Sequence, residues 1–224
     1  MKQLNKLVLS TILLTMAGSA NALPTLLDFK ADANVLERGY ASLDNYVGLK
    51  ITGTATNDND NQQFAYMDKG NAGLGSCKDL NSSNQCAPSS DDNVTADESV
   101  HFTWDSDIII TGIWFNNNHD GNRSLQGDTI SIAGDNYLFS LSDFDASRSS
   151  GNGTLADAIS KHNTDFLYGK DRFVSKNSSF DITFFDDEFY ISAIQYETVV
   201  SEPGLLALLS IGLVGIGGGK RRKK

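Results

Sequence analysis

The sequence is poor in the side chains that most enzymes use as bases and nucleophiles. It has only 3 histidines and 2 cysteines in 224 residues. His101 lies in an alternating segment, His119 in a polar loop and His162 at the end of a predicted helix, so we interpret each as a surface or packing residue rather than a base. No serine lies in a Gly-x-Ser-x-Gly motif, and residues 70–75 lack the glycine order of a dinucleotide-binding loop. The sequence therefore predicts a protein that is not an enzyme.

Positive charge is also scarce. The chain has 18 Lys and Arg against 28 Asp and Glu. Lys2, Lys6 and residues 220–224 account for seven of the cations, so the part between them has 11 and a formal charge near −17. Such a surface repels phosphate backbones, which excludes nucleic acid as a partner class. The acids are mainly Asp, which favours turns over helix, as does Asn, and this indicates a loop-rich β protein.

The N-terminal residues have the three parts of a signal peptide. Lys2 and Lys6 supply a basic start, residues 7–17 a short apolar segment, and Ala20 and Ala22 the small residues of a cleavage site. We expect export and cleavage after Ala22. Roughly 180 residues then precede Glu202, enough for one domain with its own core.

The C-terminal residues predict a second membrane segment. Glu202 and Pro203 precede an uncharged, Gly- and Leu-rich span at 204–219, which is followed by the five basic residues 220–224. A helix of that length spans roughly 24 Å, slightly less than a ~30 Å hydrocarbon core. The basic cluster would keep its end on the cytoplasmic side. One interpretation is a plain, permanent membrane anchor.

The order of these parts also resembles the PEP-CTERM sorting signal of bacterial exported proteins. Ser201 departs from that signal, because the family most often has proline there; Glu202 and Pro203 match it. The resemblance implies recognition by exosortase, a membrane-embedded enzyme, in cells that build exopolysaccharide. It implies a protein held transiently in the inner membrane and then released to the cell surface or the extracellular matrix. Residues 65–98 also resemble a segment found in the bodies of other such proteins, with no activity attached.

The segment between the two ends has the pattern of an antiparallel β protein. Apolar residues alternate with polar ones at 49–52, 100–104, 130–132 and 180–184, and the apolar runs at 108–115 and 189–196 suit buried strands. Gly134 and Asp135 suggest a hairpin turn before a strand at 137–141. Residues 154–162 have the capping and apolar spacing of a short helix. The sequence thus predicts an all-β, jelly-roll-like antiparallel β-sandwich at 23–198 with one short helix, flanked by a signal peptide at 1–22 and a sorting or anchor segment at 199–224.

The two cysteines and the acids after them form the densest group of special residues. Cys77 and Cys86 are expected to form a disulfide, because an exported chain is oxidised and no histidine pair for zinc lies nearby. Asp91, Asp92, Asn93 and Glu98 follow. These oxygen-bearing side chains suit either calcium, which takes six to eight oxygen ligands, or a solvated turn.

Other candidates for calcium are weaker. Residues 57–61 are rich in Asn and Asp, and the segment from Asn116 through Asn118 and Asp120 begins like an EF-hand loop but has Gly127 where the loop needs Glu. Trp104 and Trp114 fit either a sugar-binding face or the core, and we predict the core.

The predicted role is that of an exported surface or exopolysaccharide-matrix protein with a structural or binding function. Two alternatives stay open. One is a secreted carbohydrate-active enzyme of jelly-roll fold, and the other is a periplasm-facing protein permanently anchored by its C-terminal helix.

Overall fold

The computed structural model describes residues 22–55, 62–89, 92–118, 124–149, 154 and 164–200. The signal-peptide prediction, apart from Ala22, and the sorting-segment prediction from residue 201 onward lie outside these residues. The helix predicted at 154–162 lies outside them as well, apart from Thr154. Those three expectations stay predictions.

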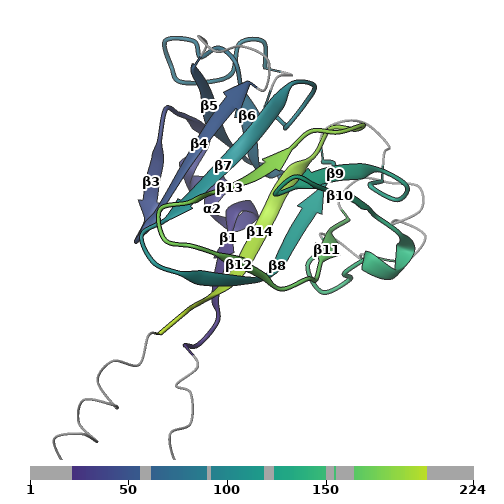
Figure 1. The fold of residues 1–224 in the computed structure, drawn as a ribbon. Helices are drawn as coiled ribbons and strands as arrows, with labels where there is room; N and C mark the ends of the chain where they lie inside the picture. Colours follow the sequence, from purple (N-terminus) through teal and green to yellow (C-terminus); the bar gives the residue numbers. More distant parts are fainter. Residues whose placement is uncertain are drawn as a thin grey trace, which may run out of the picture. The chain divides into compact units, whose positions relative to one another are not determined.

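The described residues form mainly strands (Figure 1). In chain order these are β1 (Thr25–Asp28), β2 (Arg38–Tyr40), β3 (Leu43–Tyr46), β4 (Leu49–Ala55), β5 (Gln62–Asp68), β6 (Gly73–Cys77), β7 (Glu98–Trp104), β8 (Ile108–Asn116), β9 (Thr129–Ile132), β10 (Asp135–Leu138), β11 (Phe166–Tyr168), β12 (Arg172–Val174), β13 (Ser179–Thr183) and β14 (Tyr190–Thr198). One α-helix, α2 (Phe29–Leu36), and one short 3-10 helix, η1 (Leu141–Asp143), complete the set.

The strands pair antiparallel in a single large sheet that curls into a half-barrel. The path runs β10-β9-β13-β7-β4-β5-β6-β14-β8-β11, and β1, β2, β3 and β12 pair at its sides. Strand β5 joins the two halves, because it pairs with β4 on one side and β6 on the other. The expectation of a mostly β, antiparallel fold is confirmed.

The core lies inside the curl and is rich in aromatic rings. Trp104 of β7 contacts Phe102, Phe180 of β13 and Tyr196 of β14, the last with ring centroids 5.8 Å apart. Strands β7 and β14 are separated in the path by three other strands, so this contact brings the two halves of the sheet together. Trp104 is buried, which confirms its predicted place in the core.

The apolar run at 108–115 forms the long strand β8. It pairs with β14 on one side and with β11 and β12 on the other. Its last five residues, 112–116, are all buried, so both faces of this part of the strand are covered, which explains why the run lacks regular polar alternation. The prediction of a central strand is confirmed.

The predicted hairpin is confirmed, with its turn one residue earlier than expected. Ile132 pairs with Asp135, so the two turn residues are Ala133 and Gly134. Both have positive φ, at 50° and 82°, which is the backbone that the right-handed twist of a two-residue hairpin favours. Strand β10 accordingly begins at Asp135 and ends at Leu138.

Helix α2 is an element that the sequence analysis did not predict. Its N-cap is Asp28, whose side chain accepts a hydrogen bond from the backbone N–H of Ala31 at 3.2 Å. Phe29 and Ala33, four residues apart, are fully buried, so one face of the helix is anchored in the core. The same short helix also buries Lys30, the starting point of the polar site.

Candidate functional site

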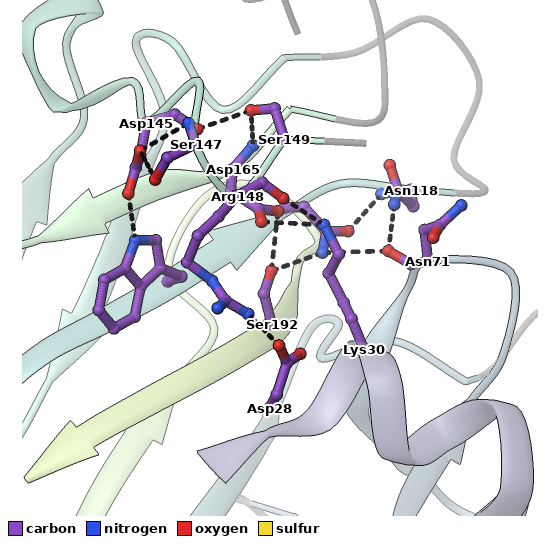
Figure 2. A network of polar contacts seen from close by, with 12 residues as sticks. Asp28, Lys30, Asn71, Asn118, Asp145, Ser147, Arg148, Ser149, Asp165 and Ser192 are labelled. Atoms are coloured by element: carbon purple, nitrogen blue, oxygen red, sulfur yellow. Dashed lines mark hydrogen bonds and ion pairs between the residues drawn. The ribbon is translucent and has the colours of Figure 1, made fainter. Parts of the chain in front are cut away.

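A buried ion pair joins helix α2 to the start of β11 (Figure 2). Nζ of Lys30 lies 2.9 Å from Oδ2 of Asp165, and the side chains are 10% and 0% exposed. The same ammonium donates a second hydrogen bond to the backbone carbonyl of Arg148, also at 2.9 Å. Three separate chain segments therefore meet at one charged group.

The other carboxylate oxygen of Asp165 belongs to a chain of neutral hydrogen bonds. Oγ of Ser192 donates to it at 3.0 Å, and Nδ2 of Asn116 donates to Oγ of Ser192 at 2.7 Å. Burial raises the pKa of Asp165, and the ammonium of Lys30 opposes that shift. Because both carboxylate oxygens have donors, the buried charge is compensated within the fold.

Arg148 forms the outer side of this network. Its Nη2 lies 3.0 Å from Oδ2 of Asp28, the N-cap of α2, and its guanidinium lies over the Trp114 ring, 5.2 Å from the centroid. Nε1 of Trp114 donates to Oδ2 of Asp145 at 2.8 Å. Burial acts against the ionised form of Asp145, but hydrogen bonds from Ser147 and Trp114 hold its pKa below the usual value. Trp114 is thus largely buried, as predicted, with its polar edge bonded.

The network borders an open pocket of about 270 Å³. Helix α2 supplies one wall, and Asn71, Ser147 and Arg148 supply the others. Among the described residues at this pocket, Lys30 is paired with Asp165 and Arg148 with Asp28, and the Ser147 hydroxyl donates to Asp145 at 2.6 Å. We conclude that the arrangement fixes α2 and the loop before β11 onto the sheet.

The predicted disulfide is confirmed. Cys77 and Cys86 are bonded, with their Cα atoms 5.9 Å apart. Together with Tyr66 they form a small buried cluster separate from the main core. The bridge closes the loop that leads to the predicted calcium residues.

The predicted calcium residues are only partly described, because Asp91 lies outside the described ranges. Asp92 accepts a hydrogen bond from the Tyr190 hydroxyl at 2.7 Å, and Glu98, which is buried, accepts one from the backbone of Thr95 at 3.0 Å. Within the described ranges, no group of three or more His, Cys, Asp or Glu side chains is arranged to hold a metal. The calcium interpretation therefore stays a prediction.

The neighbouring side chain, Asn93, forms a hydrogen bond with another residue of the same fold. Its amide nitrogen donates to Oε2 of Glu188 at 2.9 Å. Its segment packs against β6, where the Cβ of any residue other than glycine at Gly75 would lie 2.0 Å from the carbonyl oxygen of Asp92. Gly75 is therefore required by close backbone approach.

His101 has hydrogen-bond partners that the sequence did not reveal. On β7 it lies between Thr54 of β4 and Asp181 of β13 and bonds both side chains through its two ring nitrogens. The order hydroxyl, imidazole, carboxylate is that of a nucleophile with its base. These residues line neither the pocket at α2 nor the second pocket, at β10, so we read them as a cross-strand polar ladder. His119 and His162 lie outside the described residues.

Comparison of the chain with models of known protein families, with curated proteins and with solved structures finds no match. In the described part of the chain, no helix is long and apolar enough to cross a membrane.

Proposed function

We propose that the protein is exported and processed by exosortase, and that it then acts as a structural or binding component of the cell surface or exopolysaccharide matrix. The observation that carries this proposal is the order of the C-terminal parts: Glu202 and Pro203, the uncharged span at 204–219 and the basic cluster at 220–224. Proline keeps the preceding residue extended. A carboxylate on an extended strand beside the bilayer is a shape that a membrane-embedded enzyme can recognise.

Features of the described body support an extracellular, non-catalytic role. The Cys77–Cys86 disulfide suits an oxidising compartment. The buried charges of Lys30 and Asp165 serve the fold. The proposal includes a jelly-roll-like sandwich as the finer description of the curled sheet, supported by the core packed between its two halves. It also includes exopolysaccharide as the matrix partner and calcium as a bridge, supported by the excess of acids.

The test is a double substitution that leaves the membrane segment unchanged. A plain anchor depends on its hydrophobicity and on its basic flank. A sorting signal also requires the residues before the span. Glu202→Ala with Pro203→Ala should therefore leave membrane insertion intact and trap the protein at full tail length in the inner membrane. Ser201→Ala, one residue away and outside the matching positions, is the matched control.

Intact mass and cell fractionation give the readout. The wild-type protein and the Ser201→Ala control should lose the residues after the cleavage point and leave the inner membrane. If the double variant has the same mass and location as the wild type, the segment is only an anchor and the sorting proposal is wrong. Co-purification with exopolysaccharide, weakened by a calcium chelator, tests the matrix partner separately.

A further inference from the structure

A second pocket lies where the two ends of the sheet path meet. Strands β10 and β11 are the terminal strands of the path, and β12 lies beside β11 along β8. The pocket, of about 260 Å³, is lined by residues 135–137 of β10 and by Tyr168, Lys170, Asp171 and Arg172 from β11, β12 and the turn between them. No ladder of backbone hydrogen bonds joins β10 to β11 or β12 in the described residues. The junction between β10 and the pair β11 and β12, called the seam below, is therefore held by side-chain contacts.

The inner part of the pocket is held rigidly by those bridges. The rings of Tyr137 and Tyr168 meet edge to face with centroids 5.0 Å apart. Arg172 donates through Nε to the Tyr168 hydroxyl at 3.2 Å and forms an ion pair with Asp135. Burial, together with a hydrogen bond to Asp143, raises the pKa of Tyr137 to about 12. Tyr168 is buried and Tyr137 is partly buried, so the pocket exposes only part of the Tyr137 ring.

The outer part of the pocket differs from the network at α2. Lys170, Asn136 and Asp171 are exposed. Within the described part of the chain, none of the three side chains has a hydrogen bond or an ion pair. Lys170 instead places its ammonium 4.8 Å from the centroid of Tyr137. Beside the Tyr137 ring, the Lys170 ammonium and the Asn136 amide can donate hydrogen bonds, and the Asn136 amide and the Asp171 carboxylate can accept them, whereas the charged groups at α2 are bonded to one another.

We propose that this seam pocket binds a neutral saccharide unit of a longer glycan. Aromatic area with a few convergent donors and acceptors is what a hydroxyl-rich ring with apolar C–H faces requires. Two cations and two carboxylates line the pocket, so its own charge sums to zero, while the body as a whole is near −17 and disfavours an anionic ligand. The volume is slightly below the ~300 Å³ of small ligand pockets, which suits one unit of a chain that continues past the opening. The inference deepens the binding role proposed above and rests on it for the source of the glycan.

The test uses the full chain as exported, with neutral gluco-, manno- and galacto-oligosaccharides as probes and oligogalacturonate as the acidic comparison. Binding is measured by calorimetry. Asn136→Ala with Asp171→Ala removes two exposed polar side chains without touching the buried rings, and it should weaken binding about tenfold or more. Arg38→Ala is the control, because it also removes an exposed polar side chain but lies outside both pockets.

Each outcome decides the inference. Neutral binding that is lost in the double variant and kept in Arg38→Ala supports it, provided that the variants melt at the same temperature as the wild type. Absence of binding to every neutral probe, equal affinity in the double variant, or preference for oligogalacturonate overturns it. The mass of the same preparations reports tail processing, so the saccharide site can fail while the sorting proposal stands, and the reverse.

Discussion

Replacing Lys30 by methionine is the sharpest test of the buried network. Methionine keeps most of the length and apolar volume of the lysine stem but removes the ammonium. Asp165, which is 0% exposed, then loses its bonded cation and retains the neutral donor Ser192, with Arg148 as the remaining nearby positive charge. The variant thus measures the cost of a buried carboxylate that has lost its directly bonded ammonium.

The expected loss of unfolding free energy is about 3–5 kcal/mol, the usual cost of breaking a buried pair by removing one partner. This is a large part of the roughly 5–15 kcal/mol that stabilises an ordinary domain. A domain of this size loses about 2–4 °C of melting temperature per kcal/mol, so the midpoint should fall by roughly 6–20 °C. A second substitution, Asp165→Leu on the Lys30→Met background, should recover much of the loss because it removes the stranded charge.

The pH dependence of the stability of Lys30→Met is an independent test of the same buried charge. In Lys30→Met the unpaired carboxyl of Asp165 has a folded-state pKa well above its unfolded value, because burial already raises it in the wild type. The folded variant therefore takes up a proton more readily than the unfolded chain between those two values, and its stability falls as pH rises through them. The deficit relative to wild type should be smaller at pH 5 than at pH 8.

The assay is equilibrium unfolding followed by tryptophan fluorescence, since Trp104 and Trp114 are both buried. Lys69→Met is the matched control: Lys69 pairs with Glu37 at 2.7 Å, but its side chain is 61% exposed. That variant should unfold almost as the wild type does, because exposed pairs contribute little. A Lys30→Met protein that is no less stable than the Lys69→Met control would refute the assignment of a compensated buried charge.

Three further predictions concern other parts of the fold. Non-reducing peptide mapping should show Cys77 linked to Cys86, and free, alkylatable thiols in the wild type would contradict the disulfide. Replacing both cysteines by serine should lower the free energy of unfolding by about 2–3 kcal/mol in the chain-entropy account. Hydrogen bonds from His101 and Ser179 hold the pKa of Asp181 below its usual value. The ionised Asp181 carboxylate therefore stabilises the folded state above its unfolded pKa of about 3.9, and this contribution is lost as pH falls through its folded pKa. Asp181→Asn should flatten the stability profile in that acidic window; an unchanged profile would contradict the assignment. Gly75→Ala should lower the free energy of unfolding by about 1–3 kcal/mol through overpacking, because the new Cβ would lie 2.0 Å from a backbone oxygen. Thermal unfolding measures this loss, and an unchanged stability would mean that the contact is not close.

The main strands of the sheet could be predicted because their pattern is local. Alternation at Val100, Phe102 and Trp104 reports directly which side of β7 faces the core. Strand β6 shows no alternation, because all five of its residues are buried. Its Gly75 is required by close contact with the backbone of a distant loop. Helix α2 was missed for a related reason: its cap at Asp28 is readable, but its two buried anchors are too few to give a periodic pattern.

The polar sites could not be predicted from spacing. Lys30 and Asp165 are 135 positions apart, and Thr54 and His101 are 47 apart. The pairing of β4 with β7 brings Thr54 to His101, and the packing of α2 on the sheet brings Lys30 to Asp165. The sequence could indicate at most that Asp165 precedes a short apolar strand and so lies at the edge of buried surface. Tyr137 and Tyr168 likewise meet only because β10 and β11 are the two ends of one path.

The strand that leads into the C-terminal segment is bonded on both sides, and this bears on how processing could leave the body intact. Strand β14 pairs with β8 along its full length, from Tyr190 to Thr198, and with β1 and β6 on its other side. Thr198 is the last residue in that ladder and Glu202 lies four positions beyond it. A cut beside Glu202 would therefore leave every strand pairing of the described residues in place. An interior strand leaves the sheet only when two ladders break, which applies to residues 193–196 of β14, whereas Glu197 and Thr198 pair with β8 alone. If the proposed cut occurs, both ladders would stay in place.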